Sequence, residues 1–252
     1  MTKIIELINA TVDVDNGFED AKTILDNVTL TIYEHDFLTI LGGNGAGKST
    51  LFNVIAGTLS LTRGQIRILG QDVTHWPAEK RALYLSRVFQ DPKMGTAPRM
   101  TVAENLLIAR QRGEKRSLAS RKITEHLASF EDLVKRTGNG LEKHLETPAG
   151  LLSGGQRQAL SLLMATLKKP ALLLLDEHTA ALDPKTSQSL MQLTDEFVTK
   201  DGLTALMITH HMEDALTYGN RLIVMKDGNI IKDLNQMEKE QLTITDYYQL
   251  FD

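Results

Sequence analysis

The spacing of hydrophobic residues predicts strands in the first third of the chain. Apolar and polar residues alternate over residues 3–14 and, after a polar break, over residues 25–36. Successive side chains of a strand point to opposite faces, so a period of two predicts half-buried strands. Residues 37–41 form a short, mainly apolar run that is typical of a buried strand. Further strands are predicted at residues 64–69 and 82–90.

The pattern changes to a helical one between residues 91 and 150. Two prolines and a glycine interrupt residues 91–100, and Thr101 then precedes Glu104 by three positions at the head of an apolar run. This arrangement is typical of a capping box, in which the two side chains close the start of a helix. We therefore expect residues 91–150 to form a helical insertion.

Strand-like and helix-like patterns alternate from residue 171 to residue 234, beginning with an apolar run at 171–175. Strands that alternate with helices along the chain usually form a parallel sheet with helices on both faces. The sequence therefore predicts an α/β core made of residues 1–90 and 151–252. We find no internal repeat and no low-complexity segment.

Composition excludes some functions without selecting one. The chain has 252 residues, 24% of them charged, a net charge of −4 and an isoelectric point near 6.0. These values give no overall attraction to nucleic acid or anionic lipid. The absence of cysteine excludes disulfides and thiolate metal sites. No apolar run approaches the ~20 residues that span a bilayer, so we expect a soluble chain whose membrane part, if any, is another protein.

A glycine-rich loop follows the strand predicted at 37–41. Residues 42–49, GGNGAGKS, fit the spacing G-x-x-x-x-G-K-[ST], and a helical pattern begins directly after them. In such loops backbone N–H groups surround the phosphates of a nucleotide, the lysine reaches the β- and γ-phosphates, and the hydroxyl binds Mg²⁺. The expected nucleotide contacts are Gly42, Asn44, Gly45, Ala46, Gly47, Lys48, Ser49 and Thr50.

Two carboxylates end the apolar run at 171–175. Asp176 and Glu177 therefore lie at the carboxyl end of a predicted parallel strand, where open α/β sheets bind ligands. Asp176 suits the ligation of Mg²⁺, and Glu177 suits the polarisation of an attacking water. With the glycine loop, these residues predict hydrolysis of a nucleoside triphosphate. Adenine is the expected base, because no guanine-reading motif is present.

A second glycine pair has no lysine after it. Residues 151–158 read LLSGGQRQ, with Ser153, Gly154, Gly155 and Gln156 at the head of a helical pattern. Together with GGNGAGKST, LLLLDE, AALD at 180–183, Gln90 and His210, this segment resembles the ATP-binding cassette (ABC) ATPases. The six motifs occur in the order typical of that family, and the resemblance covers essentially the whole chain.

The resemblance implies a fold and an assembly. It implies a P-loop (RecA-like) core with an N-terminal antiparallel β subdomain and an inserted helical subdomain, with the signature motif at residues 152–156. Two subunits pack head to tail around two ATP molecules in this family. Each site combines the Walker loop of one chain with the signature loop of the other, so the second loop needs no lysine of its own. The helix that starts at Ser153 would supply its hydroxyl and the N–H groups of Gly154 and Gly155 as an anion clamp.

The resemblance also implies residue roles and partners. Glu177, His210 and Lys48 are expected to be catalytic, and Ser49, Gln90 and Asp176 to ligate Mg²⁺. Asp183 is expected at the subunit boundary. The expected partners are a second copy of the chain, a membrane permease and, indirectly, an extracytoplasmic substrate-binding protein, at the cytoplasmic face of the membrane. We expect no nucleic acid partner.

Three positions leave the roles of their side chains open. The family usually stacks an aromatic ring on adenine, and the nearest candidates here are Val14 and Phe18. His178 stands where the family commonly has proline; it could be catalytic, but a local substitution without a catalytic role is favoured. His211, beside His210, is expected to be a bystander because one imidazole suffices for that role.

Three functions compete within this family resemblance. The motor subunit of an importer is favoured, because residues 90–109 and 176–186 resemble importer ATPases that serve aromatic amino acids such as tryptophan or tyrosine. An ATPase acting on nucleic acid or on the ribosome is the alternative, although the chain has one cassette and no long heptad insertion. The basic segment 109–122 could bind nucleic acid or lipid headgroups, but a solvated helix face is favoured.

Overall fold

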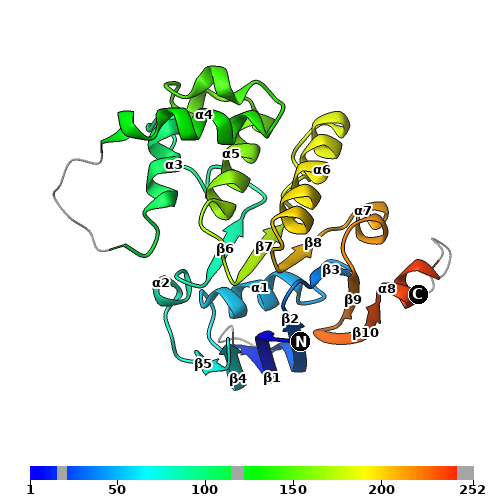
Figure 1. The fold of residues 1–252 in the computed structure, drawn as a ribbon. Coiled ribbons are helices and arrows are strands. Elements are labelled where there is room, and N and C mark those ends of the chain that lie inside the picture. Colours follow the sequence, from blue (N-terminus) through cyan, green and yellow to red (C-terminus); the bar gives the residue numbers. More distant parts are fainter. Residues whose placement is uncertain (16–21, 115–121, 243–252) are drawn as a thin grey trace.

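Two β-sheets and the helices around them make up the fold (Figure 1). The computed structural model describes residues 1–15, 22–114 and 122–242. A six-stranded sheet has the order β10-β9-β3-β8-β7-β6, and a four-stranded sheet has the order β2-β1-β4-β5. The strands are β1 (Lys3–Val14), β2 (Lys22–Tyr33), β3 (Phe37–Gly42), β4 (Arg63–Ile68), β5 (Gln71–Asp72), β6 (Leu85–Val88), β7 (Leu172–Asp176), β8 (Ala205–Ile208), β9 (Arg221–Lys226) and β10 (Asn229–Asn235).

The predicted mostly parallel sheet is confirmed. Strands β6, β7, β8, β3 and β9 are parallel, and only the edge strand β10 is antiparallel to its neighbour β9. The four-stranded sheet is antiparallel throughout, as β1 pairs with β2 and β4 and β4 pairs with β5. The short loop after β3 and the acidic end of β7 therefore lie at the same edge of the larger sheet.

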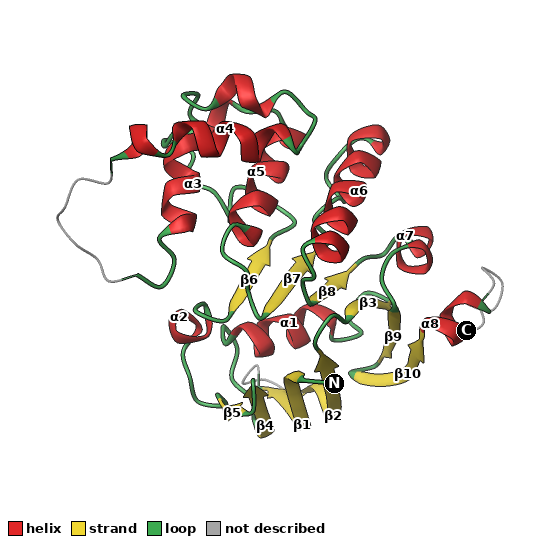
Figure 2. Cartoon of the chain, in the orientation of Figure 1, coloured by secondary structure: helices red, strands yellow, loops and turns green. Residues whose placement is uncertain are grey.

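Helices cover both faces of the six-stranded sheet (Figure 2). They are α1 (Lys48–Ala56), α2 (Ala78–Arg81), α3 (Val102–Arg110), α4 (Leu127–Lys135), α5 (Gly154–Thr166), α6 (Pro184–Lys200), α7 (Met212–Thr217) and α8 (Gln236–Glu240), with 3₁₀ turns at Ile123–Glu125, Leu141–His144 and Ala149–Leu151. Within the described parts of the chain, no helix has the length and apolar character that a membrane span requires.

The apolar run of β7 is buried because its side chains enter two separate cores. Leu172 and Leu174 pack with α1 and the four-stranded sheet, whereas Leu173 and Leu175 pack with α3, α5 and α6. All four side chains are fully buried. A strand with both faces covered needs no polar positions, which explains why residues 171–175 lack alternation.

The helical segment begins as the sequence predicts. Thr101 accepts a hydrogen bond from the N–H of Glu104, and the Glu104 carboxylate accepts one from the N–H of Thr101, so the predicted capping box at α3 is present. The strand predicted at 82–90 is shorter, however, and comprises Leu85–Val88 alone. The preceding residues continue the turn of α2, where Ala82 N–H bonds to Ala78 and Tyr84 N–H to Arg81.

Buried Arg81 explains that turn. Its guanidinium donates to the carbonyl oxygens of Val54 and Ile55 at the end of α1, at 2.6 and 3.0 Å, and to those of Val73, Thr74 and Trp76. Arg81 is thus a cap for the carboxyl end of α1 and satisfies carbonyls that the helix leaves free. Desolvation lowers its pKa, and the five carbonyl oxygens compensate part of that cost.

Candidate active site

The glycine loop joins β3 to α1 and requires glycine where its backbone is left-handed. Gly45 and Gly47 have φ of 80° and 97°, which residues with a side chain rarely adopt. A Cβ at Gly47 would also lie 2.9 Å from the carbonyl oxygen of Ile24 and 2.9 Å from Leu25 Cδ2. The loop therefore packs against β2 where it leads into α1. The helix begins at Lys48, as predicted.

Lys48 folds back over this loop. Its ammonium donates to the carbonyl oxygens of Gly42 and Gly43 at 2.7 and 2.9 Å, and the residue is only 8% exposed. Burial lowers the pKa of Lys48, and the nearby carboxylate of Glu177 partly offsets the effect. A buried cation at the amino end of a helix is a suitable site for a triphosphate.

Neighbouring parallel strands bring Glu177 and His210 together. Glu177 follows β7, His210 follows β8, and these two strands pair directly. His210 Nδ1 lies 3.0 Å from Glu177 Oε1. Glu177 has a φ of 44° and is held there by a 3.1 Å hydrogen bond from its N–H to the carbonyl of Ile208. A left-handed backbone at a residue other than glycine is costly and often marks a functional site.

Asp176 has a partner that the sequence did not predict. Its Oδ2 accepts a 2.5 Å hydrogen bond from Arg87 Nη2, and Arg87 Nη1 donates to Asn53 Oδ1 at 2.9 Å. Arg87 lies on β6 and also stacks over Phe89, with its guanidinium carbon 4.9 Å from the ring centroid. The only signal in the sequence was a basic residue within an apolar strand pattern, and its partners are distant along the chain.

The donor set at this edge fits Mg²⁺ bound together with phosphate oxygens. Within the described parts of the chain, no three His, Cys, Asp or Glu side chains gather as a metal site made of protein ligands alone would need. Ser49, in the first turn of α1, and Asp176 each offer oxygen. Mg²⁺ usually takes one or two carboxylates and completes its coordination with water and phosphate.

Gln90 lies just beyond β6, in a segment that α5 holds in place. Gln158 Nε2 donates to the carbonyl of Phe89 at 2.9 Å, and Arg157 Nε donates to Thr96 Oγ1 at 2.8 Å. Both donors lie on α5, the helix that begins at the second glycine pair. Hydrogen bonds therefore connect the segment containing Gln90 to the helix that follows Ser153.

The second glycine pair starts α5 as predicted, with Ser153 as its N-cap. Ser153 Oγ accepts a hydrogen bond from Gln156 N–H at 3.3 Å, and Gln156 Oε1 accepts one from Ser153 N–H at 3.2 Å. Residues of α1 and of α5 belong to different cores, on opposite faces of the six-stranded sheet. The two glycine loops of one chain thus do not form a common site.

Comparisons with known proteins agree with this set of motifs. The sequence profile of the family described as ABC transporter matches residues 25–180. The tyrosine transport ATP-binding protein of Clostridioides difficile (strain R20291) is 41% identical over 250 residues, which are 99% of each chain. The chain belongs to the ABC transporter family. It is an ATPase of that family.

Two further relatives extend the comparison. The spermidine/putrescine import ATP-binding protein PotA of Escherichia coli (strain K12) is 37% identical over 214 residues, so this cassette spans about half of that protein, 53% of its length. The post-hydrolysis dimer of the ATP-binding cassette MJ0796 bound to ADP and phosphate is 28% identical, with a TM-score of 0.78 over 92% of this chain and 99% of that one.

His178 of the cassette contacts α6. It is 2% exposed, and its Nε2 lies 2.9 Å from Thr194 Oγ1 on α6. Thr194 Oγ1 already donates to the carbonyl of Leu190, so it accepts from His178, whose proton is therefore on Nε2. Burial lowers the pKa of His178 to about 4. His178 joins the segment after β7 to α6.

Other predicted positions lie at the margin of the site. Val14, at the end of β1, is 45% exposed, whereas Phe18 lies outside the described residues. The ring of His211 lies 5.2 Å from that of His210, and a cleft of about 970 Å³ between α6 and α7 contains both.

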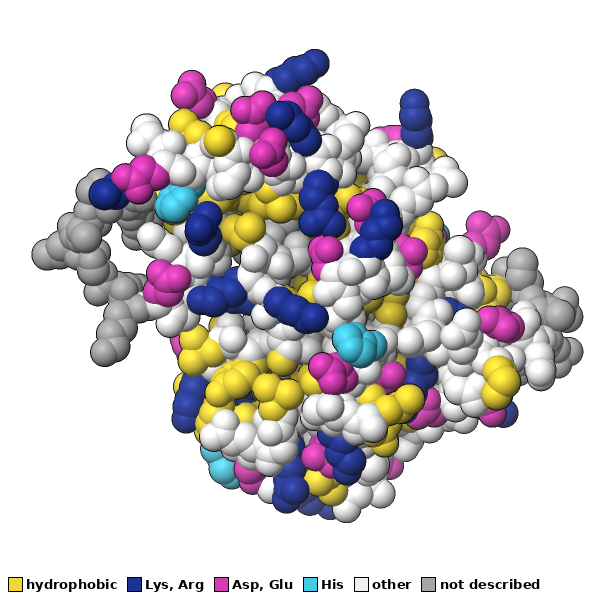
Figure 3. All heavy atoms as spheres, in the orientation of Figure 1, with side chains coloured by type: hydrophobic (Ala, Val, Ile, Leu, Met, Phe, Trp, Pro, Cys, Tyr) yellow, Lys and Arg dark blue, Asp and Glu magenta, His cyan; other side chains and the backbone are white. Residues whose placement is uncertain are grey.

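The basic segment 109–122 is described only in part, because residues 115–121 lie outside the described residues. Arg112 within it donates to the hydroxyl of Ser86 and the carbonyl of Lys168, so this cation packs inside its own chain. Figure 3 shows acidic and basic side chains interspersed on the visible face.

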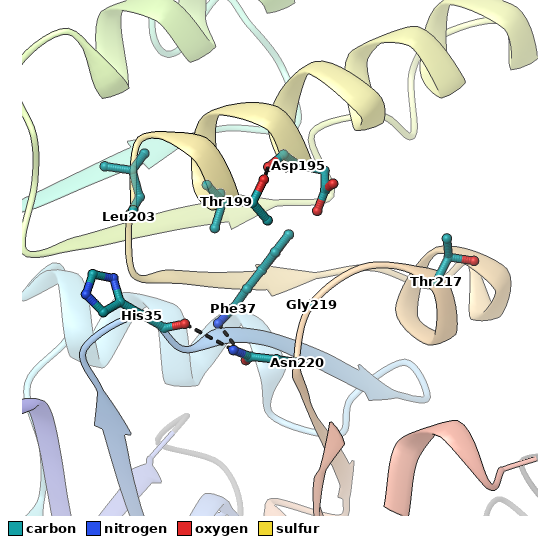
Figure 4. Close-up of a pocket in the computed structure, with 10 residues that line it drawn as sticks. His35, Phe37, Asp195, Thr199, Leu203, Thr217, Gly219 and Asn220 are labelled. Atoms are coloured by element: carbon teal, nitrogen blue, oxygen red, sulfur yellow. Dashed lines mark hydrogen bonds between the residues drawn. The ribbon is translucent and has the colours of Figure 1, made fainter. Parts of the chain in front are cut away.

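A separate pocket lies at the opposite edge of the sheet (Figure 4). Its volume is about 400 Å³, and its walls come from the start of β3, the end of α6 and the segment after α7. Asn220 braces one wall by donating to the carbonyl of His35 at 3.1 Å and accepting from the N–H of Phe37 at 2.9 Å. None of the predicted nucleotide-site residues lines this pocket.

Proposed function

We propose that this cassette is the ATP-hydrolysing motor of an importer whose membrane permease is a separate chain. The observation that carries the proposal is the Glu177–His210 pair, 3.0 Å apart at the ends of adjacent parallel strands. The partly desolvated Lys48, held by the glycine loop that precedes α1, complements it. ATP hydrolysis needs phosphate binding, water activation and charge neutralisation, and residues for each lie at this edge of the sheet.

Phosphate binding is assigned to the first glycine loop. Backbone N–H groups at the head of α1 would surround the β-phosphate, with the positive end of the helix dipole behind them. Lys48 would exchange its two carbonyl partners for β- and γ-phosphate oxygens, which its flexible side chain permits. The residues in contact would be Gly42, Asn44, Gly45, Ala46, Gly47, Lys48, Ser49 and Thr50.

Water activation is assigned to Glu177 and His210. The Glu177 carboxylate accepts a proton from the attacking water, and its left-handed backbone fixes where that carboxylate lies. His210, with its proton on Nδ1, donates to Glu177 Oε1 in the resting site and turns toward the γ-phosphate when nucleotide enters. Glu177 is then free to accept from water.

Mg²⁺ is assigned to Ser49, Asp176 and Gln90. When bound, the ion supplies positive charge that neutralises the β- and γ-phosphates. Arg87 holds one oxygen of Asp176 and leaves the other free, so it sets the direction in which that carboxylate faces. Gln90, which follows β6, would connect a bound ion to the segment that α5 holds.

A second copy of the chain would complete each site. The signature residues Ser153, Gly154, Gly155 and Gln156 begin α5 on the sheet face opposite α1, which supports their use on another subunit's nucleotide. An isologous two-fold dimer provides two such sites at once. The similarity to dimeric cassettes such as MJ0796 supports this arrangement. ATP would then join the subunits, and hydrolysis would release them.

The relatives support our proposal for the membrane partner and the cargo. The full-length similarity to a tyrosine transport ATP-binding protein supports an aromatic amino acid as cargo, delivered by an extracytoplasmic binding protein that this chain does not touch. A permease would place the cassette at the cytoplasmic face of the membrane. Residues 91–105, within the helical region 91–150, are proposed to receive a permease helix; Met94 there is 69% exposed.

Replacing Glu177 by Gln tests the proposal. The amide keeps the shape of the side chain but cannot accept the proton, so turnover should fall by roughly a thousandfold or more while ATP binding persists. ATP should then accumulate a dimer, measured by light scattering with and without nucleotide. Exposed Glu79 on α2 provides a matched control, Glu79→Gln, that should hydrolyse ATP normally and stay monomeric. A Glu177→Gln variant that remains monomeric in saturating ATP contradicts the proposed dimer.

The permease is tested separately by co-purification from detergent-solubilised membranes. A polytopic membrane protein that elutes with the cassette supports the transporter assignment. Recovery with nucleic acid or ribosomes, and retention of duplex DNA in a salt-sensitive gel shift, would support the alternative instead.

A further inference from the structure

Two helix starts lie side by side in the cassette. Helices α5 and α6 pack against each other and begin at the same, upper end in Figure 1. Ser153 caps α5, and Asp183 caps α6 by accepting a hydrogen bond from the N–H of Thr186 at 3.1 Å. The signature motif and the Asp183 turn of one chain are therefore direct neighbours.

Gly155 fits this contact only because it has no side chain. A Cβ there would lie 2.3 Å from Thr186 Cγ2, closer than van der Waals contact allows. Gly155 is helical and is not among the glycines with positive φ, so backbone conformation does not require glycine at this position. At neighbouring Gly154, a Cβ would meet Leu182 Cδ2 at 3.6 Å, an ordinary contact.

Thr186 cannot readily turn its methyl group away. The Asp183 carboxylate accepts a 3.1 Å hydrogen bond from the N–H of Thr186, and the polar side chain and N–H of Thr186 lower the pKa of Asp183. Thr186 is β-branched and lies in the first turn of α6, so few χ1 rotamers are open to it and its methyl group has few directions to take. Thr186 thus bonds to Asp183 through its N–H and lies against Gly155 with its methyl group.

We propose that Thr186 is a positioning residue that joins the signature motif to the Asp183 turn, so that both meet the second subunit as one rigid surface. The inference rests on the proposed function, since it concerns the surface that completes the other subunit's site. It also explains why residue 155 is glycine: a side chain there would collide with Thr186 of the same chain.

A rescue experiment in the Glu177→Gln background tests the proposal, with the ATP-dependent dimer dissociation constant as the readout. Gly155→Ala should weaken the dimer by about tenfold or more, because overpacking displaces the start of α5. Thr186→Ser removes the methyl and keeps the hydroxyl, so Gly155→Ala with Thr186→Ser should return to within about threefold of the parent. Thr186→Val keeps a methyl group and loses the hydroxyl, so it should give no rescue.

Two measurements separate positioning from general damage. ATP binding to the monomer should be unchanged in every variant, because Thr186 and Gly155 lie on the face opposite α1. With Glu177 restored, Gly155→Ala should lower kcat, and Thr186→Ser should restore it. A Gly155→Ala defect that Thr186→Ser does not relieve means that the glycine faces the nucleotide, and it overturns the proposal. A dimer unaffected by Gly155→Ala overturns it as well.

Melting temperatures distinguish failure of this inference from failure of the proposed function. Gly155→Ala should lower the melting temperature, Thr186→Ser should recover it, and Gly154→Ala should change it little. If the Glu177→Gln parent forms no dimer, the proposed function is contradicted. The melting temperatures still show whether Thr186 and residue 155 are in contact. If Gly155→Ala fails to fold, recovery of folded protein by Thr186→Ser supports the contact, and continued failure of the double variant refutes it.

Discussion

The two glycine-rich segments of this cassette look alike in sequence but use glycine for different reasons. In the first, Gly45 and Gly47 have left-handed backbones, and Gly47 also lies against Ile24 and Leu25. In the second, Gly154 and Gly155 are helical, and Gly155 is limited by the methyl group of Thr186. The first segment forms a loop whose shape only glycine allows. The second begins a helix whose packing only glycine allows.

The two segments also differ in what satisfies their polar groups. Lys48 lies within the first, buried and bonded to the carbonyls of Gly42 and Gly43. The second has no lysine, its buried Arg157 donates to Thr96 inside the chain, and its Ser153 and Gln156 cap each other at an exposed surface. A loop that carries its own cation can bind an anion alone. An exposed helix start without one needs a partner that supplies the charge.

The largest expected difference between the segments is in ATP binding by the isolated subunit. Lys48→Ala removes the cation that meets the phosphates, so ATP affinity should fall on the order of a hundredfold. Ser153→Arg changes only the second segment and should leave that affinity within about twofold, while hydrolysis falls sharply. Titration of a fluorescent ATP analogue measures both. An equal loss of affinity in the two variants would place Ser153 at its own chain's nucleotide.

A feature of the fold or of the site could be predicted from the sequence only where a few consecutive residues determine it. The first loop, the acidic end of β7 and the start of α5 each follow from a few consecutive residues, and the structure places them on the predicted elements. The resemblance implies a catalytic role for Glu177 and for His210, but their direct contact was not predicted, because it depends on β7 and β8 being neighbours. No local pattern specifies strand order.

The contacts of Arg87 and Thr186 could not be predicted from the sequence. Arg87 meets Asp176 and Asn53 from two other elements, and Thr186 meets Gly155 across a helix pair. Both contacts depend on tertiary packing, which spacing along the chain does not encode. The same holds for His178, whose partner Thr194 lies one strand-to-helix connection away.

His178 provides the next prediction, because it joins the end of β7, on the ATP side, to α6, which packs on the signature helix. The pKa of His178 in the folded chain, about 4, lies below the ordinary histidine value of 6.5. As pH falls from 6.5 to 4, the unfolded chain binds a proton that the folded chain excludes, so stability is lost over that window. The loss should reach about 3 kcal/mol, the product of the shift and 1.36 kcal/mol per pKa unit.

Urea unfolding of the wild type and His178→Gln at pH 7, 5.5 and 4.5 measures this effect. Glutamine keeps a donor for Thr194 but does not titrate, so the variant should lose less stability on acidification than the wild type. The difference between the two proteins cancels the contribution of other carboxylates and histidines. Parallel pH profiles for the two proteins would show that His178 is not the buried titrating group.

The smallest expected effect compares one glycine of each segment by stability alone. Gly47→Ala forces an L side chain into φ of 97° and within 2.9 Å of a backbone oxygen, which should cost about 2 kcal/mol or more of unfolding free energy. Gly154→Ala adds a Cβ that meets only Leu182, at 3.6 Å, and alanine favours helix, so the change should stay within about 0.5 kcal/mol. Denaturant titration of both variants without nucleotide measures the difference. Because neither ATP nor a second subunit is present, a large loss at Gly154 would show that the second segment, like the first, is limited by its own backbone.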